Sequence, residues 1–252
     1  MKIRRKPPKP SRSKPPLYII GFSTCPEPAE LRTWFDLEYG GLISLTDRAI
    51  GDDFDSSTLA AAHGPWSAWI QLSLPFAQAE SWQHRLSWQH SVCGAVGSTT
   101  ATRSQLVDVV LHATRLARGL TLLSGGTAYD VTTGTYLNPS DWTDRPLTQF
   151  HVKDHMTVVH DEDDERHMDW FYTRGLSKFG IDDIEVFRPK GLPSHTMRDD
   201  LIDIADELVG WGQSPNVGST IPISALDLSI RVVRHRTKLF AERPLILREI
   251  SW

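Results

Sequence analysis

Histidines and carboxylates gather in one stretch of this chain, and their side chains have the chemistry of metal ligands. The candidate ligands are His151, His155, His160, Asp161 and His167. Imidazole nitrogens and carboxylate oxygens together suit zinc, iron or manganese. A metal-dependent hydrolase or nuclease would use such an ion to activate water. The spacing matches no established metal motif, so the residue types alone carry the prediction of a divalent metal site.

The same stretch also has the pattern of a β-hairpin tip. The acidic run DEDDER, residues 161–166, lies between the apolar runs MTVV and MDWFY. An acidic loop between two apolar strands is typical of a hairpin, and its charges discourage pairing with other strand edges. On a strand, His155 and His160 point to opposite faces because their offset is odd. We favour the hairpin tip and expect no cofactor, with the metal site as the alternative.

Arg174 is the candidate ligand-binding residue, because it directly follows the aromatic run WFYT. A guanidinium group binds carboxylates and phosphates in a planar, bidentate geometry. Arg174 is therefore suited to contact an anionic ligand. Pairing with a carboxylate of the acidic loop is the interpretation we favour from the sequence.

A predicted strand near the C-terminus carries four basic residues, and two interpretations of it stay open. It forms a phosphate-binding stripe, or its cations pair with acids on a neighbouring strand. The four residues are Arg231, Arg234, Arg236 and Lys238.

The strongest catalytic motifs do not occur in this sequence. It contains no Gly-x-Ser-x-Gly, no Gly-x-x-x-x-Gly-Lys-Ser/Thr, no Gly-x-Gly-x-x-Gly and no His-Glu-x-x-His. The two cysteines, Cys25 and Cys93, do not form a Cys-x-x-Cys motif. These observations disfavour serine hydrolases, P-loop NTPases, dinucleotide enzymes and zinc proteases, without excluding them.

Charge divides the chain into a basic tail and an acidic body. Residues 1–16 hold seven Lys or Arg, five Pro and no acid, whereas residues 17–252 carry 20 basic and 31 acidic side chains. Such a tail cannot bury enough apolar surface to fold, so we expect it to be disordered. It is the one segment in which we expect contact with nucleic acid. The remainder, 17–252, is predicted to be a single domain, with subdomains 17–125 and 126–252 as the alternative division.

Hydrophobic periodicity predicts strands interspersed with a few strong helices. The clearest helix covers 104–124, where apolar residues recur at helical spacing before Gly125. Further helices are expected over 28–39, 78–90 and 197–211. Alternating segments predict strands and at least two hairpins, whereas 51–65 is predicted to be a loop. The fold class is therefore α+β, with mixed or largely antiparallel sheets covered by helices and ferredoxin-like halves as a candidate topology.

One segment resembles an uncharacterised bacterial domain family without an assigned activity. The resemblance covers Leu106 to Pro189 and rests on a helix, a Gly-Gly-x-x-Tyr-Asp hairpin, a Thr-x-Gly strand end and a Phe-Gly turn before an acidic-apolar strand. The matching residues are Gly125 to Asp130, Thr173, Gly175, Phe179, Gly180 and Glu185. These features are structural, so the resemblance implies an α+β fold and no particular reaction.

Together these patterns favour a non-enzymatic bacterial interaction or accessory protein of a regulatory or immunity type. Nine tryptophans and an acidic body suit a protein–protein interface with a basic partner. No apolar run approaches the length of about 20 residues that crosses a bilayer, and the protein is predicted to be cytoplasmic. The metal-dependent hydrolase or nuclease is the alternative function.

Overall fold

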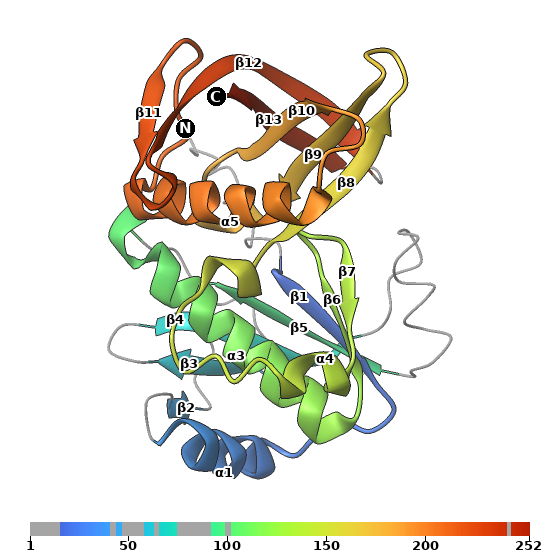
Figure 1. Cartoon of the computed structure of the whole chain (residues 1–252). Coiled ribbons are helices and arrows are strands. Elements are labelled where there is room, and N and C mark those ends of the chain that lie inside the picture. Colours follow the sequence, from blue (N-terminus) through green and yellow to red (C-terminus); the bar gives the residue numbers. More distant parts are fainter. Residues whose placement is uncertain are drawn as a thin grey trace, which may run out of the picture.

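The computed structural model describes residues 16–40, 44–46, 58–62, 66–74, 92–98, 102–240 and 243–252. Its strands form two sheets, each packed against helices, in an α+β fold (Figure 1). The fold class predicted from the sequence is confirmed. The basic tail up to residue 15, the acidic part of the predicted loop at 51–57 and the helix expected over 78–90 lie outside the described residues.

The first sheet, sheet A, contains seven described strands in the order β2-β3-β4-β5-β1-β6-β7. Their bounds are β1 Tyr18–Phe22, β2 Ser44–Thr46, β3 Thr58–Ala62, β4 Trp66–Leu74, β5 Val92–Ser98, β6 Thr127–Asp130 and β7 Thr135–Leu137. The order of β4, β5, β1 and β6, with helices after β1 and β5, is that of a ferredoxin-like unit. Strand β3 corrects the predicted loop over 51–65, because its backbone pairs with β4.

Helix α3, Leu106–Ser124, is the central helix of the molecule and packs on sheet A together with α1, Pro28–Tyr39. Its apolar stripe is buried as predicted, and Gly125 ends it in the left-handed conformation with φ 60°. A short 3₁₀ turn, η1 (Arg103–Gln105), precedes the helix, so its N-cap is Gln105 and not the predicted Ser104. Every position from 109 to 121 is buried, because protein surrounds the helix on all sides.

The polar residues of α3 are satisfied by backbone carbonyls and neighbouring side chains. Arg115 donates from Nε to the carbonyl of Leu147 at 2.8 Å. Arg118 donates to Glu38 Oε1 at 2.7 Å and to the hydroxyl of Tyr39. Because buried polar groups are costly without partners, these bonds explain how a helix with two buried arginines can lie in the core.

The second sheet, sheet B, has the order β11-β12-β13-β10-β9-β8. It consists of two antiparallel meanders joined by the parallel pair of β10 and β13. The bounds are β8 Thr157–Asp163, β9 Met168–Arg174, β10 Asp183–Pro189, β11 Thr220–Ile223, β12 Leu228–Phe240 and β13 Arg243–Ser251. The paired strands β8 and β9 confirm the predicted hairpin around the acidic run.

Helix α5, Ser194–Trp211, connects the two meanders and covers one face of sheet B. It starts three residues earlier than predicted, with Pro193 at the N-cap. Short elements complete the chain: α4 Pro139–Thr143 and the 3₁₀ turns η2 Val152–Asp154, η3 Leu176–Phe179 and η4 Ser224–Leu226.

Each sheet has its own core cluster, and Phe150 packs against both clusters at the junction. Val110 of α3 packs in the same cluster as Phe179 of η3 and Leu201 of α5. The hairpin β6–β7 belongs to sheet A, so the alternative boundary between residues 125 and 126 falls within that sheet. None of the described helices has the length and apolarity needed to cross a membrane.

Candidate functional site

The two central histidines of the predicted metal cluster point into different surroundings. His155 is 1% exposed, and its Nδ1 lies 3.0 Å from Thr114 Oγ1 in the core. His160 lies on β8, where its ring stacks on Phe171 and its Nε2 is 3.1 Å from an Asp169 oxygen. The two side chains diverge, but His155 ends the turn Val152–Asp154 before β8, so the alternation along a strand from which the divergence was predicted does not apply to it.

The other three predicted ligands have separate local roles. His151 Nε2 contacts Gln149 Nε2 at 2.9 Å. Asp161 accepts the backbone N–H of Glu162, and His167 takes a left-handed conformation with φ 54° in the hairpin turn. In the part of the chain that the structure describes, no group of three or more His, Cys, Asp or Glu is arranged to hold a metal ion. The structure therefore does not bring the predicted ligands together.

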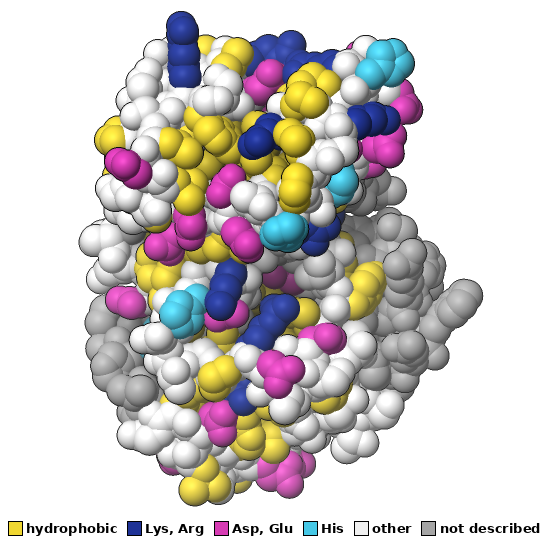
Figure 2. All heavy atoms as spheres, viewed as in Figure 1, with side chains coloured by type: hydrophobic (Ala, Val, Ile, Leu, Met, Phe, Trp, Pro, Cys, Tyr) yellow, Lys and Arg dark blue, Asp and Glu magenta, His cyan; other side chains and the backbone are white. Residues whose placement is uncertain are grey.

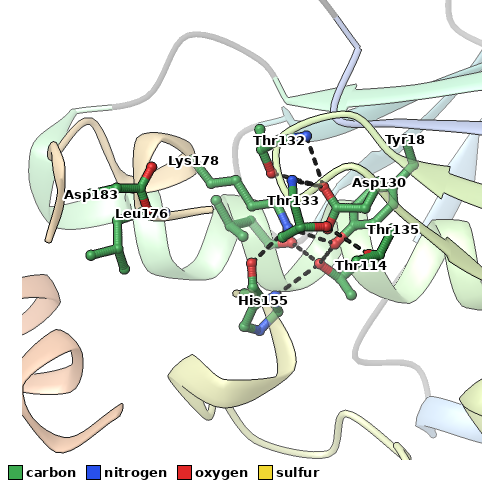
Figure 3. A network of polar contacts seen from close by, with 11 residues as sticks. Tyr18, Thr114, Asp130, Thr132, Thr133, Thr135, His155, Leu176, Lys178 and Asp183 are labelled. Carbon is green, nitrogen blue, oxygen red and sulfur yellow. Dashed lines mark hydrogen bonds and ion pairs between the residues drawn. The ribbon is translucent and has the colours of Figure 1, made fainter. Parts of the chain in front are cut away.

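A buried polar network centred on Lys178 instead joins the two sheets (Figure 3). The Lys178 side chain is fully buried and donates to Asp130 Oδ2 at 2.5 Å, to the His155 carbonyl at 2.7 Å and to Tyr18 Oη at 3.3 Å. These three acceptors match the three protons of an ammonium group. Burial lowers the pKa of Lys178, but Asp130 and Tyr18 outweigh burial and hold that pKa above its ordinary value. Lys178 is thus a buried cation whose role is structural.

His155 is linked to this network through Thr114. The Thr114 hydroxyl lies 2.8 Å from the Val110 carbonyl, 3.1 Å from Tyr18 Oη and 3.0 Å from His155 Nδ1. Burial, and then the charge of Lys178, lower the pKa of His155 to about 3, so its ring is neutral. Its buried Nε2 has no hydrogen-bond partner among the described residues.

Asp130 also holds the turn between β6 and β7. Its second oxygen, Oδ1, accepts the backbone N–H of Thr132 at 3.0 Å, the Thr132 hydroxyl at 2.8 Å and the Thr133 N–H at 3.2 Å. One carboxylate therefore fixes the turn on sheet A and, through Lys178, the turn η3 that follows β9 of sheet B. Both segments form walls of the cavity described next.

A cavity of about 190 Å³ lies between the β6–β7 turn and sheet B. Its polar lining residues are Thr132, Arg174, Ser177, Asp182 and Asp183. Its apolar lining residues are Tyr129, Val131, Ile181, Pro244, Leu245 and Ile246. The cavity thus has mainly apolar walls with a few charged groups, and the walls come from both sheets.

Asp183 is the most perturbed acid of this cavity. It is 3% exposed, and its Oδ1 accepts the Thr173 hydroxyl at 3.0 Å and the Leu176 N–H at 3.1 Å. Burial raises the pKa of Asp183 to about 7, although these hydrogen bonds and Arg174 favour the ionised form. The carboxyl group therefore changes its charge near neutral pH.

Arg174, the predicted ligand-binding residue, ends strand β9 and lines the cavity. Its guanidinium group lies against Gly134, where a Cβ atom would come within 2.4 Å of a terminal nitrogen. Gly134 also has a φ of 72°, so the turn geometry and the space for Arg174 both require glycine. Burial lowers the pKa of Arg174, while Asp183 and Asp130 are the carboxylates that most oppose this shift. Those carboxylates lie inside the molecule and differ from the acidic loop favoured on sequence grounds.

The neighbouring carboxylate, Asp182, is engaged by a cation. Arg248 Nε donates to Asp182 Oδ2 at 2.7 Å. Arginines of the basic strand β12 also form ion pairs with carboxylates of sheet B. Arg234 pairs with Glu249 at 3.2 Å, and Arg236 pairs with Glu185. Pairing with an acid on the neighbouring strand, one of the two interpretations of this basic strand, is thus confirmed for Arg234, whereas the partner of Arg236 lies on β10, one strand further across the sheet.

Comparison with known protein families, with curated proteins and with solved structures finds no match to this chain. The resemblance to an uncharacterised bacterial family stays a prediction. Sequence reasoning identified Arg174 but missed Lys178, Asp130 and Asp183. These residues lie far apart in the chain or in ordinary turn contexts, so no local pattern pointed to their joint role.

Proposed function

We propose that this protein is a non-enzymatic accessory protein that binds a small molecule carrying an anionic group in the cavity between its two sheets. The observation that carries the proposal is the presence of Arg174 and Asp183 in one mainly apolar cavity. Small-molecule sites are typically concave and apolar, with a few placed polar groups, and occur at boundaries between structural units. A perturbed acid in such a place is a further mark of a functional site.

The volume of the cavity limits the size of the ligand. A water molecule occupies about 30 Å³ of the liquid, so a cavity of about 190 Å³ accommodates a molecule of fewer than about ten non-hydrogen atoms. Arg174 can hold a carboxylate or phosphate of such a molecule through paired N–H donors. The apolar walls then bury the remainder of the ligand.

The described lining residues support binding better than catalysis. Covalent catalysis requires a nucleophile within reach of a base. The hydroxyl of Thr132 is already bound to Asp130. Asp183 is the one described lining residue whose pKa lies near neutrality, and its Oδ1 is committed to Thr173 and Leu176. The alternative metal-dependent hydrolase has less support, because the candidate histidines diverge.

A protein partner, expected from the sequence, is a second part of the proposal. Helix α5 carries five acidic residues and one arginine, and Figure 2 shows acidic side chains gathered over this helix. Such a surface favours a basic partner and steers its approach. A partner of this kind would respond to the ligand if ligand binding stabilises the junction beneath α5.

Thermal unfolding and calorimetry with a panel of small carboxylates, among them amino acids, and inorganic phosphate test the proposed ligand site. A ligand at 100 times its Kd stabilises the native state by about 2.7 kcal/mol, which is a measurable shift in Tm. The variant Arg174→Gln should abolish the shift, whereas Arg198→Gln, at an exposed position on α5, should retain it. A panel that leaves Tm unchanged, or a shift that survives Arg174→Gln, would overturn the proposal.

A further inference from the structure

The cavity presents opposite charges to its ligand from two neighbouring strands. Strands β9 and β10 are paired as far as Tyr172 and Glu185, and Arg174 and Asp183 lie at the adjoining ends of these two strands. Both side chains line the same cavity, so one small molecule can contact both.

Among the residues that the structure describes, no cation forms an ion pair with Asp183. Arg174 has a smaller effect on the pKa of Asp183 than burial and the hydrogen bonds from Leu176, Thr173 and Gly175. Asp182, by contrast, is bound to Arg248. A ligand with an anionic group alone would meet two aspartates in the cavity, and like charges close together repel.

We propose that the ligand is a zwitterion of the α-amino acid class with an apolar side chain. This inference rests on the function proposed above and names its ligand. The carboxylate of the amino acid binds Arg174 and its ammonium group binds Asp183, so both charges are paired. The apolar side chain contacts Tyr129, Leu245 and Ile246. The cavity holds about six water volumes, and because bonded atoms lie closer together than neighbouring waters, it suits small amino acids such as alanine and valine better than larger ones.

Because Asp183 can gain or lose a proton when the ligand binds, the number of protons exchanged on binding tests this proposal. The charged groups that line the cavity with Asp183 are Arg174 and Asp182, and Asp182 is paired with Arg248. Burial raises the pKa of Asp183 to about 7, and a ligand ammonium would lower it again. Binding of an amino acid below pH 7 therefore releases a proton from Asp183. A carboxylate without an ammonium group raises the pKa and would cause proton uptake instead.

Calorimetry of the full chain with L-valine and with isovalerate, its counterpart without the ammonium group, tests the inference. Measurements at pH 6 in two buffers of different ionisation enthalpy count the protons exchanged. We expect L-valine to bind at least tenfold more tightly than isovalerate and to release up to one proton, with no release at pH 8. Asp183→Asn should remove the preference for L-valine, whereas the exposed-site control Asp199→Asn should retain it.

The outcomes separate the inference from the function on which it rests. Equal affinity for the two probes, or proton uptake with L-valine, would overturn the amino acid assignment while leaving the anion site intact. Binding of neither probe, nor of any member of the carboxylate and phosphate panel, would overturn both. The proton count needs only the wild-type chain, so it remains decisive if Asp183→Asn fails to fold.

Discussion

Replacing Asp183 by asparagine should stabilise the protein, and the gain should grow with pH. The pKa of Asp183 rises from 3.8 in the unfolded chain to about 7 in the folded protein, chiefly because of burial. Above pH 3.8 the unfolded chain loses this proton while the folded protein keeps it, so folding stability falls until about pH 7. Each pKa unit corresponds to about 1.4 kcal/mol, so the loss is about 2 kcal/mol at pH 5 and about 4 kcal/mol at pH 8.

Asparagine removes this pH-dependent loss and keeps much of the local geometry. Its Oδ1 can still accept from Thr173 and Leu176. Any cost of the exchanged amide group is constant with pH, so the change with pH is the readout. Urea unfolding followed by circular dichroism between pH 4 and pH 8 gives the difference in free energy of unfolding between variant and wild type. A difference that is independent of pH, or that shrinks as pH rises, would refute the argument.

His155 makes the free energy of unfolding change with pH in the opposite direction to Asp183, and the same experiment should reveal this contribution. Its pKa falls from 6.5 to about 3 on folding, so below pH 6.5 the unfolded chain binds a proton that the folded protein does not. Folding stability therefore falls as pH drops from 6.5 towards 3. Between pH 3.8 and pH 6.5 the slopes of His155 and Asp183 cancel in the wild type. In Asp183→Asn the His155 slope of about 1.4 kcal/mol per pH unit should remain alone above the background of the other carboxylates.

Three further predictions concern the junction and the core. Lys178→Met should cost about 3–5 kcal/mol in unfolding free energy, because it leaves the buried Asp130 carboxylate unpaired, and adding Asp130→Asn should recover part of that loss in urea unfolding. Gly134→Ala should cost about 1–3 kcal/mol through its positive φ and should weaken ligand binding measured by calorimetry, because the new methyl group displaces Arg174; unchanged affinity would contradict this. Leu116→Ala in α3 should cost about 2–5 kcal/mol, whereas Leu123→Ala, 36% exposed on the same helix, should cost clearly less in the same thermal or urea unfolding experiment.

Local patterns predicted many of the elements because their physical causes are local. The helix of α3 follows from apolar residues at helical spacing and a glycine that takes the left-handed conformation at its end. The β8–β9 hairpin follows from an acidic run between two apolar strands. Strand β3 escaped prediction because its short, alanine-rich sequence has weak strand propensity, and only pairing with β4 makes it a strand.

The candidate site was predicted only at Arg174. Lys178 lies 48 positions from Asp130 and 160 from Tyr18, so no spacing rule could join them. The raised pKa of Asp183 comes from burial, which depends on how both sheets close over it. The predicted histidine cluster failed for the converse reason. Its residues are close in sequence, but their side chains point in different directions and do not meet in space.

The sequence by itself determined the α+β class, the main helices and the acidic hairpin, because helix and strand periodicity fix which side chains share a face. Only the tertiary structure decided that Asp130 and Lys178 form a buried ion pair between the two sheets and that Arg174 and Asp183 line one cavity. Those relations depend on which segments meet in space, and burial at that meeting point sets the charge state of each group.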